Sequence, residues 1–161
     1  MRALGEIVYG VASPGQIAGR TGLQMLQAMI DGELPAPPIA QALGFLLVEV
    51  GDGFSVFEAD TGPHLLNPLG IVHGGWALTL IDSVTGCAVH TTLPPDVGYA
   101  TVETKVNFIR PILADSGRVR GEGRVISRGR QVLTAEGKLT DSRGRLLAHG
   151  TSTLLVLAPR A

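Results

Sequence analysis

The sequence is poor in cysteine, in aromatic residues and in long apolar runs. Its single cysteine, Cys87, cannot form an internal disulfide, which excludes a disulfide-stabilised scaffold. No stretch approaches the roughly 20 consecutive apolar residues that a membrane-spanning helix needs. The apolar start of the chain is broken by Gly5 and Glu6, so it lacks the core of a signal peptide. With 161 residues, we expect one cytoplasmic globular domain with no membrane partner.

Charge is almost balanced overall, at a net charge of −1, but it is unevenly distributed. Residues 1–104 contain two basic and ten acidic residues, whereas residues 105–145 contain ten basic and four acidic residues. Arginines at alternating, solvent-facing strand positions would explain the basic segment without any ligand. The alternative is a small phosphate-bearing molecule. Nucleic acid is not expected, because aromatics make up only 4% of the chain and do not alternate with the arginines.

Two parts of the chain differ in pattern. Residues 1–34 are predicted to be an N-terminal extension with one short helix over Gly22–Asp31, whose residues are mostly good helix formers. Pro35-Ala-Pro-Pro38 then favours extended backbone and prevents the helix from continuing. Residues 35–161 are predicted to form a single domain.

Six strands and one long helix are predicted in this domain. Leu43–Val50 and Phe54–Asp60 are apolar runs separated by Gly51-Asp52-Gly53, which is typical of a hairpin. From Gly74 to about Thr92 the pattern is helical and apolar nearly all round, so we expect a helix buried on every side. The remaining strands are predicted at residues 99–108, 117–127, 131–140 and 145–157; short turns join them, which predicts an antiparallel meander.

The order of these elements predicts an α+β fold. An antiparallel sheet has one face to cover, and only one long helix is available to cover it. The sheet is therefore expected to curl around the helix over residues 74–92.

The start of this helix carries His73-Gly74-Gly75. Glycines there let a ligand approach bare backbone, and the free N–H groups of the first turn favour developing negative charge. An ordinary loop-to-helix junction with a hydrogen-bonded histidine is the alternative. Asp82, eight residues after Gly74, is a carboxylate in an apolar helix, and such a group must be paired, protonated or functional. A polar stripe that reaches solvent, or a hydrogen bond at a subunit contact, would also explain it.

Gly74 and Asp82 are separated by about 12 Å along the helix axis, at about 1.5 Å per residue. One substrate carbonyl cannot easily touch both. If both act on the same atom, the helix start of one subunit must meet the carboxylate of another, so the spacing predicts a dimer with shared sites.

Asn67, His73-Gly74-Gly75 and Asp82, followed by Arg110-Pro111 and the strand pattern, resemble the hotdog-fold acyl-CoA thioesterases of the phenylacetyl-CoA and 4-hydroxybenzoyl-CoA type. The resemblance covers about residues 20–157, including Leu26 to Pro35. It implies the hotdog fold, a sheet wrapped around one central helix. It also implies homodimers joined sheet edge to sheet edge, with dimers paired into homotetramers and active sites at the dimer interface.

The resemblance also implies roles for individual residues. Gly74 would donate its backbone N–H to the thioester oxygen, Asn67 would help hold the acyl carbonyl, and His73 would orient their loop. Asp82 of the partner would be the general base or the nucleophile. Thr101 matches a hydroxyl position that orients water or the carboxylate in some relatives, although its strand parity places it off the helix-facing side.

The expected reaction is hydrolysis of an aryl- or medium-chain acyl-CoA to the free acid and CoA. The candidate substrate-binding residues are Gly75, Arg110, Arg128 and Arg130, and the three arginines are the candidate contacts for the CoA phosphates at a solvated tunnel mouth. No cofactor is expected, and no metal, because the four histidines lack metal-ligand spacing. A hotdog hydratase or dehydratase, and a non-catalytic acyl-CoA or acyl-carrier binding domain, remain as alternatives.

Overall fold

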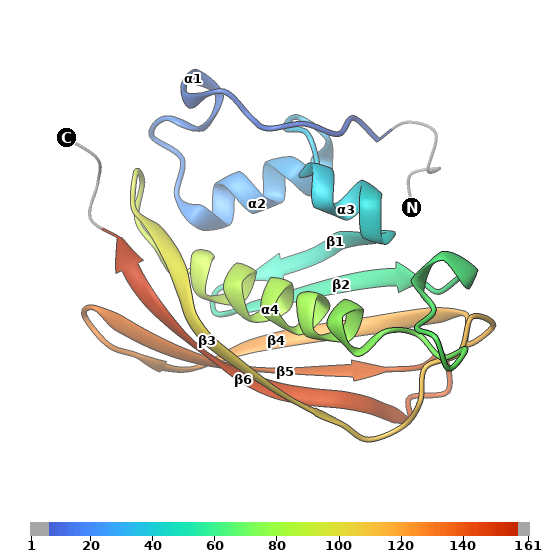
Figure 1. Ribbon diagram of the computed structural model, residues 1–161. Coiled ribbons are helices and arrows are strands. Elements are labelled where there is room, and N and C mark those ends of the chain that lie inside the picture. The colour runs from blue at the N-terminus through green and yellow to red at the C-terminus, as the bar shows by residue number, and fades with distance from the viewer. Residues whose placement is uncertain (1–6, 158–161) are drawn as a thin grey trace.

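The computed structural model describes residues 7–157. A six-stranded antiparallel sheet curves around one long helix, α4 (Gly74–His90), which confirms the predicted fold class (Figure 1). The strands are β1 (Phe45–Gly51), β2 (Phe54–Asp60), β3 (Gly98–Phe108), β4 (Arg118–Arg128), β5 (Val132–Thr140) and β6 (Leu146–Leu157). The shorter helices are α1 (Pro14–Ile17), α2 (Gly22–Asp31), α3 (Pro38–Leu43) and the 3-10 helix η2 (Pro63–Leu65). No helix within residues 7–157 is long and apolar enough to cross a membrane.

The position of β3 differs from the predicted meander. The sheet order is β1-β2-β4-β5-β6-β3, so β4, β5 and β6 are neighbours as expected but β3 pairs with β6 instead of β4. The link between β3 and β4 is longer than a hairpin turn. It stays attached to β6 through bonds from the N–H groups of Ile109 and Arg110 to Leu147 O, and then passes the start of α4, where Val72 N donates to Ile112 O. As a result β3 is an edge strand.

The sheet packs closely on α4 because glycines on its concave face make room for the helix. A Cβ at Gly123 would lie 2.1 Å from Val84 O, and one at Gly137 would lie 2.9 Å from the Val84 side chain. Helix residues Leu80, Ile81 and Val84 are completely buried in this contact. The alternation of Arg and small residues in β4 therefore has the predicted meaning, with the small residues facing the helix.

One stripe of α4 is not buried, which corrects the prediction of burial on every side. Leu78 is 39% exposed, and Asp82, one turn later on the same side, is half-buried. Asp82 accepts a hydrogen bond from Thr104 of the edge strand β3, where the sheet ends. An additional chain could cover this stripe.

The N-terminal helices lie on the side of α4 opposite β4, β5 and β6 (Figure 1). Helix α2 has the predicted bounds and begins with a capping box in which Thr21 Oγ1 accepts from Gln24 N. Helix α3 was not predicted: Pro38 occupies its first turn, where proline needs no N–H partner. The Trp76 indole N–H donates to Leu43 O at 2.9 Å, which ties the end of α3 to α4.

Candidate active site

The start of α4 presents one free backbone donor. His73 is the N-cap residue, and its Nδ1 accepts from Gly75 N at 2.9 Å, while Trp76 N donates to His73 O. Within residues 7–157 no acceptor receives the N–H of Gly74. Gly74 is therefore the donor at this helix start that remains available to a ligand oxygen, and His73 holds the turn that presents it.

Asn67 shapes the loop that precedes this turn. Its Oδ1 accepts from Leu69 N at 2.9 Å and from Ile71 N at 3.3 Å, and its backbone N–H donates to Ile71 O. His73 N in turn donates to Leu65 O, which fixes the other end of the loop. Because the Asn67 carbonyl is occupied, its side-chain NH₂ group is the part left to bind a substrate oxygen.

Asp82 is held by a chain of hydroxyl groups from the sheet. Thr104 Oγ1 on β3 donates to Asp82 Oδ1 at 3.2 Å, and the same hydroxyl lies 2.9 Å from Ser152 Oγ on β6. Ser152 Oγ lies 2.7 Å from Thr85 Oγ1, and both residues are buried. Thr85 Oγ1 donates its one proton to Ile81 O at 2.9 Å, so Thr85 can only accept from Ser152, and Thr104 is the hydroxyl that donates to the carboxylate. Sequence reasoning missed Thr104, whose signal is its place among the helix-facing positions of β3.

Gly74 and Asp82 lie about 12 Å apart on the regular helix α4, and both border the edge strand β3. A Cβ placed on Gly74 would come 3.1 Å from Phe108 Cζ, while Asp82 is bonded to Thr104. Phe108 is 59% exposed. The two candidate catalytic groups therefore lie along one open edge of the sheet, but one chain does not bring them together.

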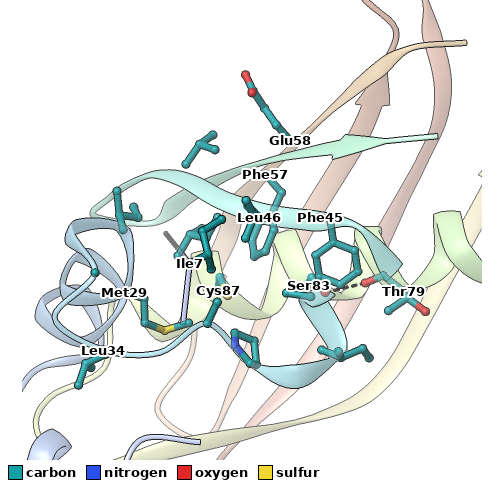
Figure 2. Close-up of a pocket in the computed structure, with 18 of the residues that line it drawn as sticks. Ile7, Met29, Leu34, Phe45, Leu46, Phe57, Glu58, Thr79, Ser83 and Cys87 are labelled. Carbon is teal, nitrogen blue, oxygen red and sulfur yellow. Dashed lines mark hydrogen bonds between the residues drawn. The ribbon is translucent and has the colours of Figure 1, made fainter. Parts of the chain in front are cut away.

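A cavity of about 780 Å³ opens beside Asp82 (Figure 2). We call it the chamber. The N-terminal segment of residues 7–44 lines one side, β1 and β2 another, and the face of α4 that carries Thr79, Asp82, Ser83 and Cys87 a third. Figure 2 shows Met29 and Ile7 from the N-terminal segment around the same space as Leu46 of β1 and Cys87 of α4. Its size is that of pockets that bind drug-sized molecules, roughly 300–1,000 Å³.

Cys87 and Tyr99, which both line the chamber, are uncharged. Burial raises the pKa of the Cys87 thiol to about 12, with a smaller contribution from the nearby Asp82 carboxylate. Burial likewise raises the pKa of Tyr99, and Cys87 and Asp82 add to the shift. Both groups remain protonated at neutral pH, so Cys87 is not a nucleophile in this environment.

The candidate arginines lie apart from one another. Arg110 Nη1 donates to Leu146 O at 2.7 Å at the end where α4 begins, and Arg128 pairs with Asp52 at 3.0 Å. Arg128 is in register with Leu133 and, one strand further, with Leu154. Leu146 and Leu154 are eight positions apart on β6, which corresponds to about 25 Å of strand. Arg130 follows β4 and has no ion-pair partner within residues 7–157.

Other arginines pair with acidic residues on the convex face of the sheet. Arg118 contacts Glu58 and Asp60 at 3.1 Å each, and Arg120 contacts Glu122 at 3.0 Å. The pKa of both guanidinium groups is raised, chiefly by these hydrogen bonds. The arginines of β4 therefore lie on the solvent-facing side of the sheet, as the ligand-free interpretation of the charge pattern predicts, and Arg118 pairs there with acidic residues from the first half of the sequence.

Comparison with known proteins identifies the family. The model of the thioesterase superfamily matches residues 69–148. A Mycobacterium tuberculosis protein named "Putative esterase Rv1847" is 30% identical over 134 residues, which cover 78% of this chain and 94% of that protein. The chain belongs to the thioesterase superfamily. The chain is therefore a hydrolase with the hotdog fold, which confirms the predicted family and enzyme class.

Two further proteins similar to this chain have names that refer to a pathway or an activity. A phenylacetic acid degradation-related protein from Ralstonia eutropha has a solved structure that superposes with a TM-score of 0.74 at 32% identity, covering 81% of this chain and 98% of that one. The proofreading thioesterase EntH of Klebsiella pneumoniae is 29% identical over 103 residues, which cover 64% of this chain and 74% of EntH.

The position of Thr101 corrects the expectation that this residue lies off the helix-facing side of the sheet. The pairing of β3 with β6 shifts between Thr101 and Glu103, so that Val102 is an extra residue in β3. Thr101 pairs with Leu154, which is completely buried, and so belongs to the helix-facing side of the sheet. The bulge reversed the expected side, and Thr101 remains a candidate at the open edge.

Proposed function

We propose that this thioesterase hydrolyses aryl- or medium-chain acyl-CoA to the free acid and CoA, at sites shared between two subunits. The observation that carries the proposal is the placement of the free Gly74 N–H and the Asp82 carboxylate along the same open edge strand. Because β3 is unpaired on one side, a second copy of the chain can extend the sheet there.

Two-fold pairing of the β3 edges brings the catalytic groups together. In one chain Gly74 lies beside Phe108 and Asp82 beside Thr104. An antiparallel pair centred near Val106 sets Phe108 of one chain opposite Thr104 of the other, at the ordinary strand spacing of about 4.8 Å. The Gly74 N–H of one subunit then faces the Asp82 of the second. The same pairing covers exposed Leu78, which supports the dimer; a pair of dimers, a homotetramer, is part of the proposal.

The chemistry follows from this composite site. The thioester oxygen accepts a hydrogen bond from Gly74 N–H at the positive end of α4, and the Asn67 NH₂ group provides a second donor. Asp82 from the other subunit removes a proton from water, which adds to the carbonyl carbon, or attacks that carbon directly to form an anhydride that water then opens. The C–S bond breaks, and the CoA sulfur leaves as a thiolate that takes up a proton. Thr104 orients the carboxylate, and Thr101 is a candidate to position the water.

Two findings support an acyl-CoA substrate. The chamber next to Asp82 has room for an aryl or medium-chain acyl group, and the similar protein from Ralstonia eutropha is named for phenylacetic acid degradation. Arg110 lies at the Gly74 end of the site and is the arginine best placed for a CoA phosphate. A cytoplasmic location is part of the proposal, because CoA esters are intracellular metabolites, and cell fractionation tests it.

Release of free thiol from benzoyl-CoA, phenylacetyl-CoA and hexanoyl-CoA tests the function. The proposal expects continuous turnover that depends on enzyme concentration. Stoichiometric binding without thiol release would instead identify an acyl-CoA binding domain. Hydration of an enoyl-CoA with the thioester intact would identify a hydratase.

A further inference from the structure

The chamber contains one feature that restricts the substrate beyond its size. The side chains around it are mostly apolar, and on α4 the hydroxyl protons are already used: Thr79 Oγ1 donates to Gly75 O at 2.9 Å, and Ser83 Oγ donates to Thr79 O at 2.8 Å. The Tyr99 hydroxyl and the Cys87 thiol are neutral. None of these groups offers a positive charge to a ligand.

Glu58 borders the chamber but belongs to the convex face. Its carboxylate pairs with Arg118 at 3.1 Å, and its side chain points away from the other labelled residues in Figure 2. Asp82 is then the carboxylate that faces the chamber, and no Lys or Arg is among the described residues that line it. An acyl group with a terminal carboxylate would lose its hydration and meet only like charge.

The N-terminal segment forms the wall opposite α4. Met29 and Ile30 of α2, Leu34, and Ile39 and Ala40 of α3 all line the chamber, whereas the concave faces of β4, β5 and β6 are filled by α4 itself. Asp82 and Cys87 are five positions apart on α4, so the chamber extends about 7 Å along the helix between them. The depth available beyond that point is set by lining residues within the segment 29–40.

We propose that the chamber is an acyl pocket selective for uncharged, apolar acyl groups, and that residues 29–40 determine the length it accepts. The inference rests on the proposed hydrolysis at Asp82 and adds the substrate class. Since the chamber and Asp82 belong to the same chain, the subunit that supplies the carboxylate also selects the acyl group.

The selectivity for uncharged acyl groups is tested with two esters whose acyl groups have six carbons each, hexanoyl-CoA and adipoyl-CoA. Only the adipoyl group carries a terminal carboxylate. We expect kcat/KM for hexanoyl-CoA to exceed that for adipoyl-CoA by at least about a hundredfold, the consequence of burying an unpaired carboxylate. Equal values would overturn the proposal while leaving the hydrolase function intact.

The proposal that the N-terminal segment sets the accepted acyl length is tested by substitutions at Met29, with Met25 as the matched control. Met25 lies one turn earlier on α2 and does not line the chamber. Met29→Ala should shift the preference from hexanoyl-CoA toward decanoyl-CoA by about tenfold, and Met25→Ala should leave it unchanged. Met29→Lys should raise turnover of adipoyl-CoA relative to hexanoyl-CoA, while Met25→Lys should not. Identical behaviour of the Met29 and Met25 variants contradicts the assignment.

Calorimetry separates this inference from the proposed function. Asp82→Asn should bind hexanoyl-CoA at least tenfold more tightly than adipoyl-CoA, since the pocket still lacks a cation. If the wild-type protein cleaves neither ester yet the variant binds selectively, the hydrolase proposal fails and the pocket assignment stands. Equal binding of the two esters overturns the pocket assignment whatever the turnover.

Discussion

Charged residues on the convex face of the sheet form ion pairs, whereas Asp82 of α4, beside the chamber, is hydrogen-bonded to a hydroxyl group. On the convex face Arg118 and Arg120 each contact more than one carboxylate, and the groups involved are exposed or partly exposed to water. On the side of the chamber, Asp82 is half-buried, and its Oδ1 accepts a hydrogen bond from the hydroxyl of Thr104. Exposed pairs contribute little individually and lose strength with salt, whereas a partly buried carboxylate without a cation is retained for a reason other than stability. This difference supports the proposal that the arginine-rich strands belong to the scaffold and that Asp82 is catalytic.

The largest effect is expected at Asp82. Asp82→Asn keeps the shape and removes the basic or nucleophilic oxygen, so kcat for acyl-CoA hydrolysis should fall by about two to four orders of magnitude. Thermal unfolding should show that the fold is intact. Near-normal turnover by this variant would show that Asp82 is not part of the mechanism, and the contrast with the ion pairs of the convex face would then have no functional meaning.

Thr104 should give the next effect. Thr104→Val removes the hydrogen bond that orients Asp82 Oδ1, so kcat should fall by about tenfold with KM little changed. Thr153→Val is the matched control, because Thr153 donates at 3.2 Å to Glu103, an exposed residue. Should both variants lose the same activity, the effect would reflect the sheet and not the carboxylate.

A smaller effect on KM is expected at the CoA-binding end. Arg110→Ala should raise KM for acyl-CoA several-fold with kcat nearly unchanged, because a solvated arginine neutralises only part of the phosphate charge. A higher salt concentration should reduce the difference in KM between the wild type and Arg110→Ala. Arg128→Ala and Arg130→Ala test whether those residues share this role. An acyl-pantetheine has no nucleotide, so a penalty that persists with it would mean that Arg110 serves the β6 backbone alone.

The smallest effect belongs to the convex face. Arg120→Gln should lower the free energy of unfolding by no more than about 1 kcal/mol and leave kcat unchanged. Hydrogen bonds from Arg120 and Lys138 lower the pKa of Glu122. A lowered carboxyl pKa stabilises the fold above the unfolded-state pKa of about 4.3, and that contribution is lost as the pH falls through the folded-state pKa. The difference between wild type and variant should therefore shrink in acid, measured by urea unfolding at pH 7 and pH 3.

Local pattern was enough to predict the long helix, the hairpin over residues 51–53 and the inward face of β4. It was also enough to single out Gly74 and Asp82, because a glycine pair at a helix start and a carboxylate in an apolar helix are visible in the sequence itself.

Long-range pairing could not be predicted in this way. The sequence between Phe108 and Arg118 does not reveal which strand lies beside β3, so the edge position was missed. The bulge at Val102 reversed the side assigned to Thr101, and Thr104 became visible as the partner of Asp82 only when β3 and β6 were placed together. The pattern Pro35-Ala-Pro-Pro38 favours extended backbone and so does not predict helix α3, although proline suits the first turn of a helix.

The central claim is that each site combines Gly74 of one subunit with Asp82 of the other, and subunit mixing tests it directly. Gly74→Pro removes the free N–H while fitting the first helical position, and His73 already has the extended backbone that precedes proline, with ψ of 133°. In a heterodimer of Gly74→Pro with Asp82→Asn, one of the two composite sites is wholly wild-type. Two inactive parents unfolded and refolded together at equal amounts should recover about a quarter of wild-type activity. A verified heterodimer with no more activity than its parents would contradict the shared site.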